Sequence, residues 1–93
     1  MNLEEARKKI DETDEQLVKL FSERMKLVTE VAKYKKENNL PIYHASRERE
    51  VINNLVDKVP EDLEIYVKIL YNTLFDVSRS YQFKAVEDTL MSP

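Results

Sequence analysis

A long stretch without helix-breaking residues, from Asn2 to Asn38, constrains the fold of this chain most strongly. Its apolar residues recur at alternating intervals of three and four, the heptad spacing of a helix that packs against other helices. Asn2 and Glu5 can form a capping box at its start, and Asn39 and Pro41 follow its end. The stretch therefore predicts one very long helix. Eight of its ten seam positions are apolar, and the heptad seam consists of Leu3, Ala6, Ile10, Thr13, Leu17, Leu20, Arg24, Leu27, Val31 and Tyr34.

The length of this helix favours a second chain. At about 1.5 Å per residue, the helix spans ~55 Å. A compact chain of 93 residues has a radius of gyration of only ~12 Å. The helix extends beyond any compact monomer, so we expect its seam to be shared with a second copy in a homodimer. The chain length also predicts a single domain over residues 1–93, near the size at which one core is marginal.

The composition excludes several classes of function. The chain has no glycine, so a P-loop or a dinucleotide-binding turn is excluded. With no cysteine and one histidine, disulfides, a thiol nucleophile and a Cys/His zinc site are not expected. A net charge of −3 gives no overall attraction to nucleic acid. No apolar run has the length of a membrane span or signal peptide, and we expect a cytoplasmic protein with no membrane partner.

Two further helices are expected after the linker Asn39–Ala45. The second, short helix begins with Ser46 as a good N-cap and runs to about Lys58. Its apolar face consists of Val51, Ile52, Leu55, Val56 and Val59. The third, medium helix begins after Pro60 and runs to about Val86 or further. Its apolar stripe consists of Leu63, Tyr66, Val67, Leu70, Leu74, Val77, Ser78 and Tyr81. The pattern predicts an all-α protein of three helices.

Arg24 and Lys35 are the first cations that stand out. Arg24 occupies a seam position, where it can pair with a glutamate or extend to the surface. Lys35 points within about 20° of the same direction, ~16 Å further along the axis, so the two side chains could hold a small anion between them. Lys35 also suits the negative end of the helix dipole. Arg7 lies ~25 Å before Arg24 and points elsewhere, so it could reach such a ligand only from a second chain.

Arg47 and Glu48 open the second helix. Each lies four positions before an apolar residue of that helix, so both are expected to point toward its packed side. Glu48 suits the positive end of the helix dipole. The dipole disfavours Arg47 there, which indicates a bound anion or an acidic neighbour.

Ser78 and Gln82 place polar groups on an inward face. They continue the line of Leu74 at intervals of four residues. A helix leaving the core near its end would explain Gln82 more easily than Ser78.

His44 and Ser46 could suggest a nucleophile pair. No acid in the neighbourhood is placed to orient the imidazole, so a surface or capping role is the better interpretation of His44.

Four motifs in order carry a resemblance to a known family. Taken together, from Leu3 to about Lys84, the chain resembles the all-helical class of chorismate mutases. The motifs are ARKKID (Ala6–Asp11), SER followed by EVAKYK (Ser22–Arg24 and Glu30–Lys35), LPI with SRERE (within Leu40–Glu50), and the pair Ser78 and Gln82.

The resemblance implies both a reaction and an assembly. Members of this family rearrange chorismate to prephenate, the branch step toward phenylalanine and tyrosine, without a cofactor or metal. They form intertwined helical homodimers with two identical sites, each built from both chains. They occur alone or fused to other enzymes of the pathway, and both possibilities remain open for this chain.

The resemblance assigns four residues to the charged ends and the breaking bond of the substrate. Arg7 of the partner chain matches the arginine that binds one carboxylate, and Arg24 matches the arginine on the other. Lys35 and Gln82 match the two donors to the ether oxygen of the breaking bond. Arg24, Lys35 and Gln82 are thus the expected catalytic residues.

Four more residues match the remainder of the substrate-binding site. Arg47 matches an arginine of the pocket wall, Glu48 matches the acceptor of the ring hydroxyl, and Ser78 matches a hydroxyl near a carboxylate. His44 stands where members usually carry Asp, so the resemblance carries over only its backbone as a contact to the ring hydroxyl. We predict that His44→Asp keeps or raises activity.

Two alternatives compete with this interpretation. An isochorismate-pyruvate lyase uses the same scaffold and cations but lacks the glutamate at the position of Glu48, which favours the mutase. A non-catalytic helical dimerisation module would explain the heptad seam. It would not explain Arg24, Arg47, Ser78 and Gln82 together.

Overall fold

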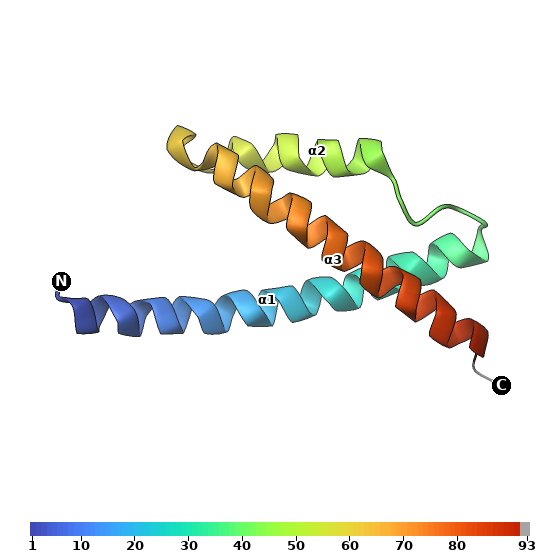
Figure 1. The fold of residues 1–93 in the computed structure, drawn as a ribbon, viewed down its shortest axis with the longest axis horizontal. Coiled ribbons are helices and arrows are strands. Elements are labelled where there is room, and N and C mark those ends of the chain that lie inside the picture. The colour runs from blue at the N-terminus through green and yellow to red at the C-terminus, as the bar shows by residue number, and fades with distance from the viewer. Residues whose placement is uncertain (92–93) are drawn as a thin grey trace.

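The computed structural model describes the backbone of residues 1–91 and the side chains of residues 1–86. Within these residues the chain is all-α, as predicted, and no strand occurs. The elements are α1 (Leu3–Glu37), α2 (Ala45–Val56), the 3₁₀ turn η1 (Glu61–Leu63) and α3 (Glu64–Met91). Figure 1 shows α3 crossing α1 near the end of α1, with α2 beside the first half of α3. Helix α3 therefore joins the other two helices into one open layer of 55 × 29 × 14 Å.

The start of α1 is fixed by Asn2 and Glu5. Asn2 Oδ1 accepts a hydrogen bond from the Glu5 backbone N–H at 2.8 Å. Asn2 Nδ2 donates in return to Glu5 Oε1 at 3.3 Å. The predicted cap is therefore present, although the Glu5 carboxylate binds the side chain of the cap instead of its backbone.

The end of α1 is a Schellman motif. The Leu40 N–H donates to the Lys35 carbonyl at 2.7 Å, and the Asn39 N–H donates to the Lys36 carbonyl at 3.3 Å. Asn39 has a φ of 54°, the left-handed conformation that this motif requires. Because asparagine tolerates this conformation better than most residues, it can take the usual place of glycine in a chain that has none.

The side chains buried within one chain lie beside the heptad seam and not on it. Met25 and Ala32 are buried at the crossing with α3, together with Phe75, Ser78 and Gln82. Met25 and Ala32 each follow a seam residue by one position, a rotation of about 100° around α1. The seam itself remains largely uncovered, with exposed side chains at Leu3, Ile10, Leu17, Leu20, Leu27, Val31 and Tyr34.

The boundaries of α2 differ from the prediction. His44 is the N-cap and Ala45 the first helical residue, so the expectation that Ser46 caps the helix is wrong. The Ser46 hydroxyl instead lies 3.0 Å from His44 Nε2. The helix ends at Val56, two residues before the predicted end at Lys58.

The inward face of α3 is rotated relative to the predicted stripe. Val67, Leu74 and Ser78 turn inward as expected. Tyr71 and Phe75, which the prediction omitted, complete this face, and their rings meet edge to face at 5.9 Å between centroids. The other predicted positions are exposed in the single chain, namely Leu63, Tyr66, Leu70, Val77 and Tyr81.

Helix α3 extends through most of the predicted tail. It continues to Met91, and the final two residues of Ala85–Pro93 lie outside the described part of the chain. Across the described residues, no helix has the length and apolar character that a membrane span requires.

Candidate active site

A pocket of about 260 Å³ lies between all three helices and the linker that follows α1. Its apolar lining comes from Leu27, Val28, Val31, Ile42, Val51 and Phe75. Seven of the eight predicted site residues also line it, namely Arg24, Lys35, His44, Arg47, Glu48, Ser78 and Gln82. Polar residues from four separate segments therefore converge on one concave surface, the usual form of a ligand site. We call it the central pocket.

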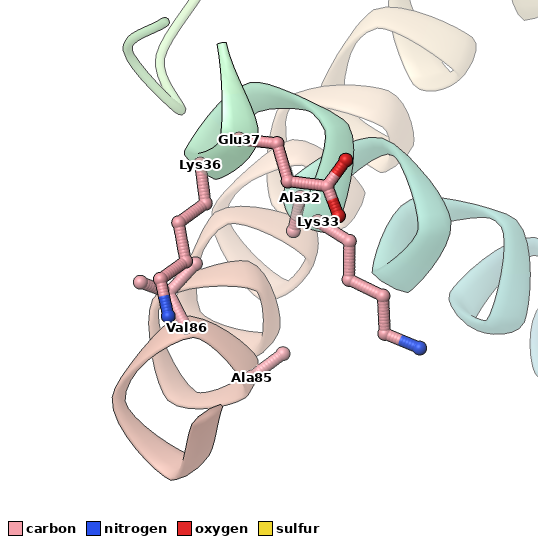
Figure 2. Close-up of a pocket in the computed structure, with 6 residues that line it drawn as sticks. All are labelled: Ala32, Lys33, Lys36, Glu37, Ala85 and Val86. Carbon is pink, nitrogen blue, oxygen red and sulfur yellow. The ribbon is translucent and has the colours of Figure 1, made fainter. Parts of the chain in front are cut away.

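Another pocket lies where the end of α1 meets α3 (Figure 2). It has a volume of about 210 Å³ and is lined by Ala32, Lys33, Lys36, Glu37, Ala85 and Val86. None of the predicted site residues lines this pocket, so the central pocket is the candidate active site.

Arg24 reaches across the helix crossing to α3. Its Nη1 donates to Ser78 Oγ at 2.6 Å, and its guanidinium carbon lies 6.0 Å from the centre of the Phe75 ring. Among the described residues Arg24 makes no ion pair, so the expected alternative of a glutamate partner does not apply here. Its partners are neutral, and its positive charge is therefore available to an anion in the pocket.

Lys35 connects the end of α1 to the linker. Its Nζ donates to the Ile42 carbonyl at 2.7 Å. Burial lowers the pKa of Lys35 below its usual range, and the nearby negative charge of Glu48 partly opposes this effect. Lys35 and Glu48 both line the central pocket, so a partly buried ammonium and a carboxylate share it.

Glu48 forms an ion pair with Arg79 that the sequence interpretation missed. Arg79 Nη1 donates to Glu48 Oε2, and the two side chains are only 24% and 23% exposed. Arg79 Nη2 donates to Asp76, and the guanidinium carbon stacks 5.0 Å from the centre of the Tyr43 ring. The hydrogen bond to Glu48 is the main cause that raises the pKa of Arg79.

Arg47 and His44 lie at the rim of the central pocket. The Arg47 side chain is 60% exposed and pairs with Glu50 one turn along α2, at 2.5 Å. The expectation that Arg47 turns toward the packed side is therefore wrong, whereas the expected acidic neighbour is present. His44 is exposed beside Ser46, and its carbonyl accepts the Glu48 N–H at 3.2 Å.

Gln82 lies one turn after Ser78 on the buried face of α3. Its Oε1 is buried and has no hydrogen-bond partner among the described residues. An unpaired buried amide oxygen is unfavourable, and rotation of the amide exchanges the donor and the acceptor. Gln82 can therefore offer either group to a ligand.

Arg7 is the predicted site residue that does not line the central pocket. It is exposed near the start of α1. It precedes Arg24 by 17 residues on a continuous helix, a separation of ~25 Å along the axis. Within one chain it cannot contact a ligand held by Arg24.

Cationic side chains outnumber carboxylates in the lining of the central pocket. Four cations, Arg24, Lys35, Arg47 and Arg79, line it together with the single carboxylate of Glu48. Arginine and lysine bind carboxylates and phosphates through charge-assisted hydrogen bonds. The pocket is therefore suited to a small organic anion with at least one hydroxyl or other donor for Glu48.

The spacing of Arg79 from the aromatic residues of α3 could have indicated that its side chain points inward. Arg79 follows Phe75 by four residues, so both lie on the same face of the helix. A stripe drawn through Tyr71 and Phe75 would have included it, whereas the predicted stripe passed through Leu70 and Leu74.

Comparison with protein families and curated proteins gives a consistent result. The family model for chorismate mutase type II matches residues 6–83. A chorismate mutase of Methanocaldococcus jannaschii is 34% identical over 90 residues, which cover 94% of this chain and 90% of that protein. The match to this relative thus extends over nearly the full length of both proteins.

Two longer relatives match over part of their length. A bifunctional chorismate mutase/prephenate dehydratase of Aquifex aeolicus is 41% identical over 54 residues, covering 58% of this chain and 15% of that protein. The T-protein of Haemophilus influenzae is 44% identical over 46 residues, covering 50% of this chain and 12% of that protein. No solved structure gave a significant match. The family match over residues 6–83 and the full-length relative together show that this chain belongs to the chorismate mutase type II family.

Proposed function

We propose that this protein is a chorismate mutase, which rearranges chorismate to prephenate in the biosynthesis of phenylalanine and tyrosine. One observation carries the proposal within the family: Arg24 and Lys35 of α1 and Gln82 of α3 line one pocket rich in cations. Chorismate is a dicarboxylate with a ring hydroxyl and an ether oxygen, and the pocket offers complementary groups for one carboxylate, the hydroxyl and the ether oxygen.

The reaction is an intramolecular Claisen-type rearrangement. The ether C–O bond breaks while a new C–C bond forms, and electrons move within a single ring of six atoms. No nucleophile, proton transfer or redox partner is needed for this step. The task of the protein is to hold the dianion in its compact, reactive conformation. Arg24 would bind one carboxylate while Ser78 keeps its guanidinium fixed at 2.6 Å.

Negative charge grows on the ether oxygen as the C–O bond breaks. Lys35 would donate to this oxygen after exchanging its hydrogen bond with the Ile42 carbonyl. The Gln82 amide would donate from the opposite helix. Because both interactions strengthen in the transition state, they raise the rate and not only the affinity. Loss of one such donor typically costs about 3 kcal/mol of barrier.

Glu48 would accept a hydrogen bond from the ring hydroxyl, and the backbone at His44 would contact the same group. Arg47 lies further out at the rim and would contribute to the positive potential that attracts the substrate. A substrate without the ring hydroxyl should therefore bind less well, because the carboxylate of Glu48 would lose its ligand partner.

We also propose that the working form is an intertwined homodimer in the cytoplasm, with Arg7 of the partner chain completing each site. The proposal is supported by the uncovered heptad seam, where Leu17 and Leu27 are 57% and 68% exposed. An apolar stripe this long on one helix is a surface that a second chain would cover. Arg7 would bind the second carboxylate, which has no other assigned partner.

The proposed function can be tested directly with purified protein. Chorismate absorbance should fall on addition of the protein, and prephenate should be identified as the product. The same assay with isochorismate tests the lyase alternative, for which salicylate and pyruvate would be the products. Turnover of isochorismate without turnover of chorismate would contradict the proposal, as would a folded protein that acts on neither substrate.

A further inference from the structure

We propose that Arg79 is a positioning residue for Glu48, which it holds in the orientation that accepts the substrate hydroxyl and keeps away from Lys35. This inference rests on the proposed function, because it concerns how a side chain of that active site is held in its active orientation. It adds a residue to which the family resemblance assigned no role.

The contacts of Arg79 argue for an indirect role. Its Nη1 is engaged by Glu48 and its Nη2 by Asp76, while one face of the guanidinium stacks on Tyr43 at 5.0 Å. Both terminal nitrogens of the fork are thus occupied by protein groups. Arg79 is therefore less available than Arg24, whose side-chain partner is the neutral Ser78, to bind a substrate carboxylate.

The position of the ion pair argues for an effect on geometry. Glu48 lies in the first turn of α2, Arg79 lies on α3, and Tyr43 lies in the linker. The pair thus fixes the entrance of α2 against α3 through partly buried side chains, with 24% and 23% exposure. A partly buried, charge-assisted hydrogen bond restricts a carboxylate more than an exposed one does.

Lys35 is the group that Glu48 would otherwise bind. Glu48 already acts on Lys35 electrostatically from across the pocket. The other charged or titratable groups around Glu48 are Arg79 and Asp76 on α3, Tyr43 and His44 in the linker, Arg24 on α1 and Arg47 on α2. Without Arg79, the carboxylate would be free to turn toward the Lys35 ammonium. The lysine would then lose its availability to the ether oxygen, and Glu48 would lose its availability to the ring hydroxyl.

The kinetic test is a double-mutant cycle between Arg79 and Glu48. Arg79→Met keeps the length of the side chain and removes its charge, and we expect it to lower kcat/KM between about 10- and 100-fold through misplacement of the site. Arg79→Lys should recover part of the loss. In a Glu48→Gln background, where no carboxylate remains to be held or to capture Lys35, Arg79→Met should have little further effect. The matched control is Arg49→Met, an exposed arginine next to Glu48 in the sequence.

Three kinetic outcomes would overturn the proposal. Unchanged or increased activity in Arg79→Met would show that the ion pair does not support the site. An equal loss in the presence and absence of Glu48 would show that Arg79 binds substrate itself. A loss in Arg49→Met as large as in Arg79→Met would show a general effect of charge.

A second measurement does not depend on turnover. A guanidinium that is held by hydrogen bonds rotates slowly and exchanges its protons slowly, so its Nη–H resonances become visible by NMR. We expect such signals for Arg79 in the wild type, their loss in Glu48→Gln and their retention in Asp76→Asn. Their absence from the wild type would overturn the positioning role, whereas their presence in a protein that does not consume chorismate would refute the proposed function alone.

Discussion

Lys35 is the residue that should set the pH dependence of the reaction. It must be protonated to donate to the ether oxygen, and burial lowers its pKa. Because the donor is lost when Lys35 deprotonates, kcat/KM should fall as the pH rises, with a midpoint below that of an ordinary lysine. Gln82 does not titrate, so the profile should be flat through neutrality. The measurement is kcat/KM for chorismate as a function of pH.

Two variants isolate the contribution of Lys35 to this profile. Lys35→Gln should lower kcat/KM and remove the alkaline fall. The neighbouring Lys36→Gln, which lies outside the central pocket, should leave the profile as it is in the wild type. A sharp acidic optimum in the wild type would count against the assigned role of Gln82, since it would indicate a titrating donor at that position.

His44→Asp replaces His44 with the residue that family members usually carry at this position, and so tests the effect of that difference. His44 is the N-cap of α2 but its side chain makes no capping bond. Aspartate caps helices well and suits their N-terminal dipole, so the variant should be more stable by about 1 kcal/mol. Activity should be kept or raised, because the carboxylate can add a contact to the ring hydroxyl. Thermal unfolding and kcat/KM measure the two effects, and a large loss of kcat/KM would refute the assignment of this position.

At the scale of residues, the sequence was a good guide to which side chains line the site. It was a poorer guide to which side chains form pairs there. Arg24, Ser78 and Gln82 could be identified because each is polar at a position where packing requires an apolar group. The sequence analysis did not identify Arg79, because its inward orientation depends on which face of α3 packs against α2. That choice is a property of the tertiary structure. The predicted orientation of the Arg47 side chain was wrong for a similar reason, because Arg47 pairs with Glu50 on the surface of α2.

At the scale of elements, the Schellman motif at Asn39 links stability to the site. Asn39 holds a positive φ of 54°, and a β-branched residue there costs about 1–2 kcal/mol. Asn39→Val should therefore lower the free energy of unfolding by this amount, whereas Asn39→Gly should keep or raise it. Urea unfolding at one fixed protein concentration measures both, with Asn53→Ala on the surface of α2 as control.

The Asn39→Val substitution should also affect the active site. The Lys35 carbonyl accepts the 2.7 Å hydrogen bond of the motif, and the Lys35 side chain binds the linker at Ile42. Distortion by Asn39→Val should therefore move Lys35 and lower kcat/KM, while Asn39→Gly should not. If the valine variant is as stable and active as the wild type, the motif has no such role.

Helix identity was easier to predict than helix ends or faces. The heptad pattern without Gly or Pro was sufficient for α1, and its cap residues marked both ends. For α2, Ser46 had the right chemistry for a cap, but the chain enters the helix two residues earlier and the hydroxyl binds His44. For α3, two adjacent apolar lines run along the helix, and the sequence alone could not decide which one would be covered within a single chain.

At the scale of the whole molecule, one chain leaves much of its apolar surface uncovered. Its radius of gyration is 16.7 Å, against ~12 Å for a compact chain of this length. The small buried cluster around Ala32 and Phe75 joins α1 to α3, while the first half of α1 lies apart from the other helices in Figure 1. This shape agrees with the proposal that a second chain covers the heptad seam and brings Arg7 to the central pocket.

The most direct measurement is activity in a heterodimer of two inactive chains. Arg7→Ala and Arg24→Ala should each abolish most activity, because each removes a carboxylate partner from both sites. In a purified heterodimer one site would contain both arginines and the other neither, so the activity should be about half that of the wild type. The matched control combines Arg24→Ala with Lys35→Ala, which damages both sites and should restore nothing. Failure of the first pair to regain activity, or equal recovery in the control, would contradict a mutase site built from two chains.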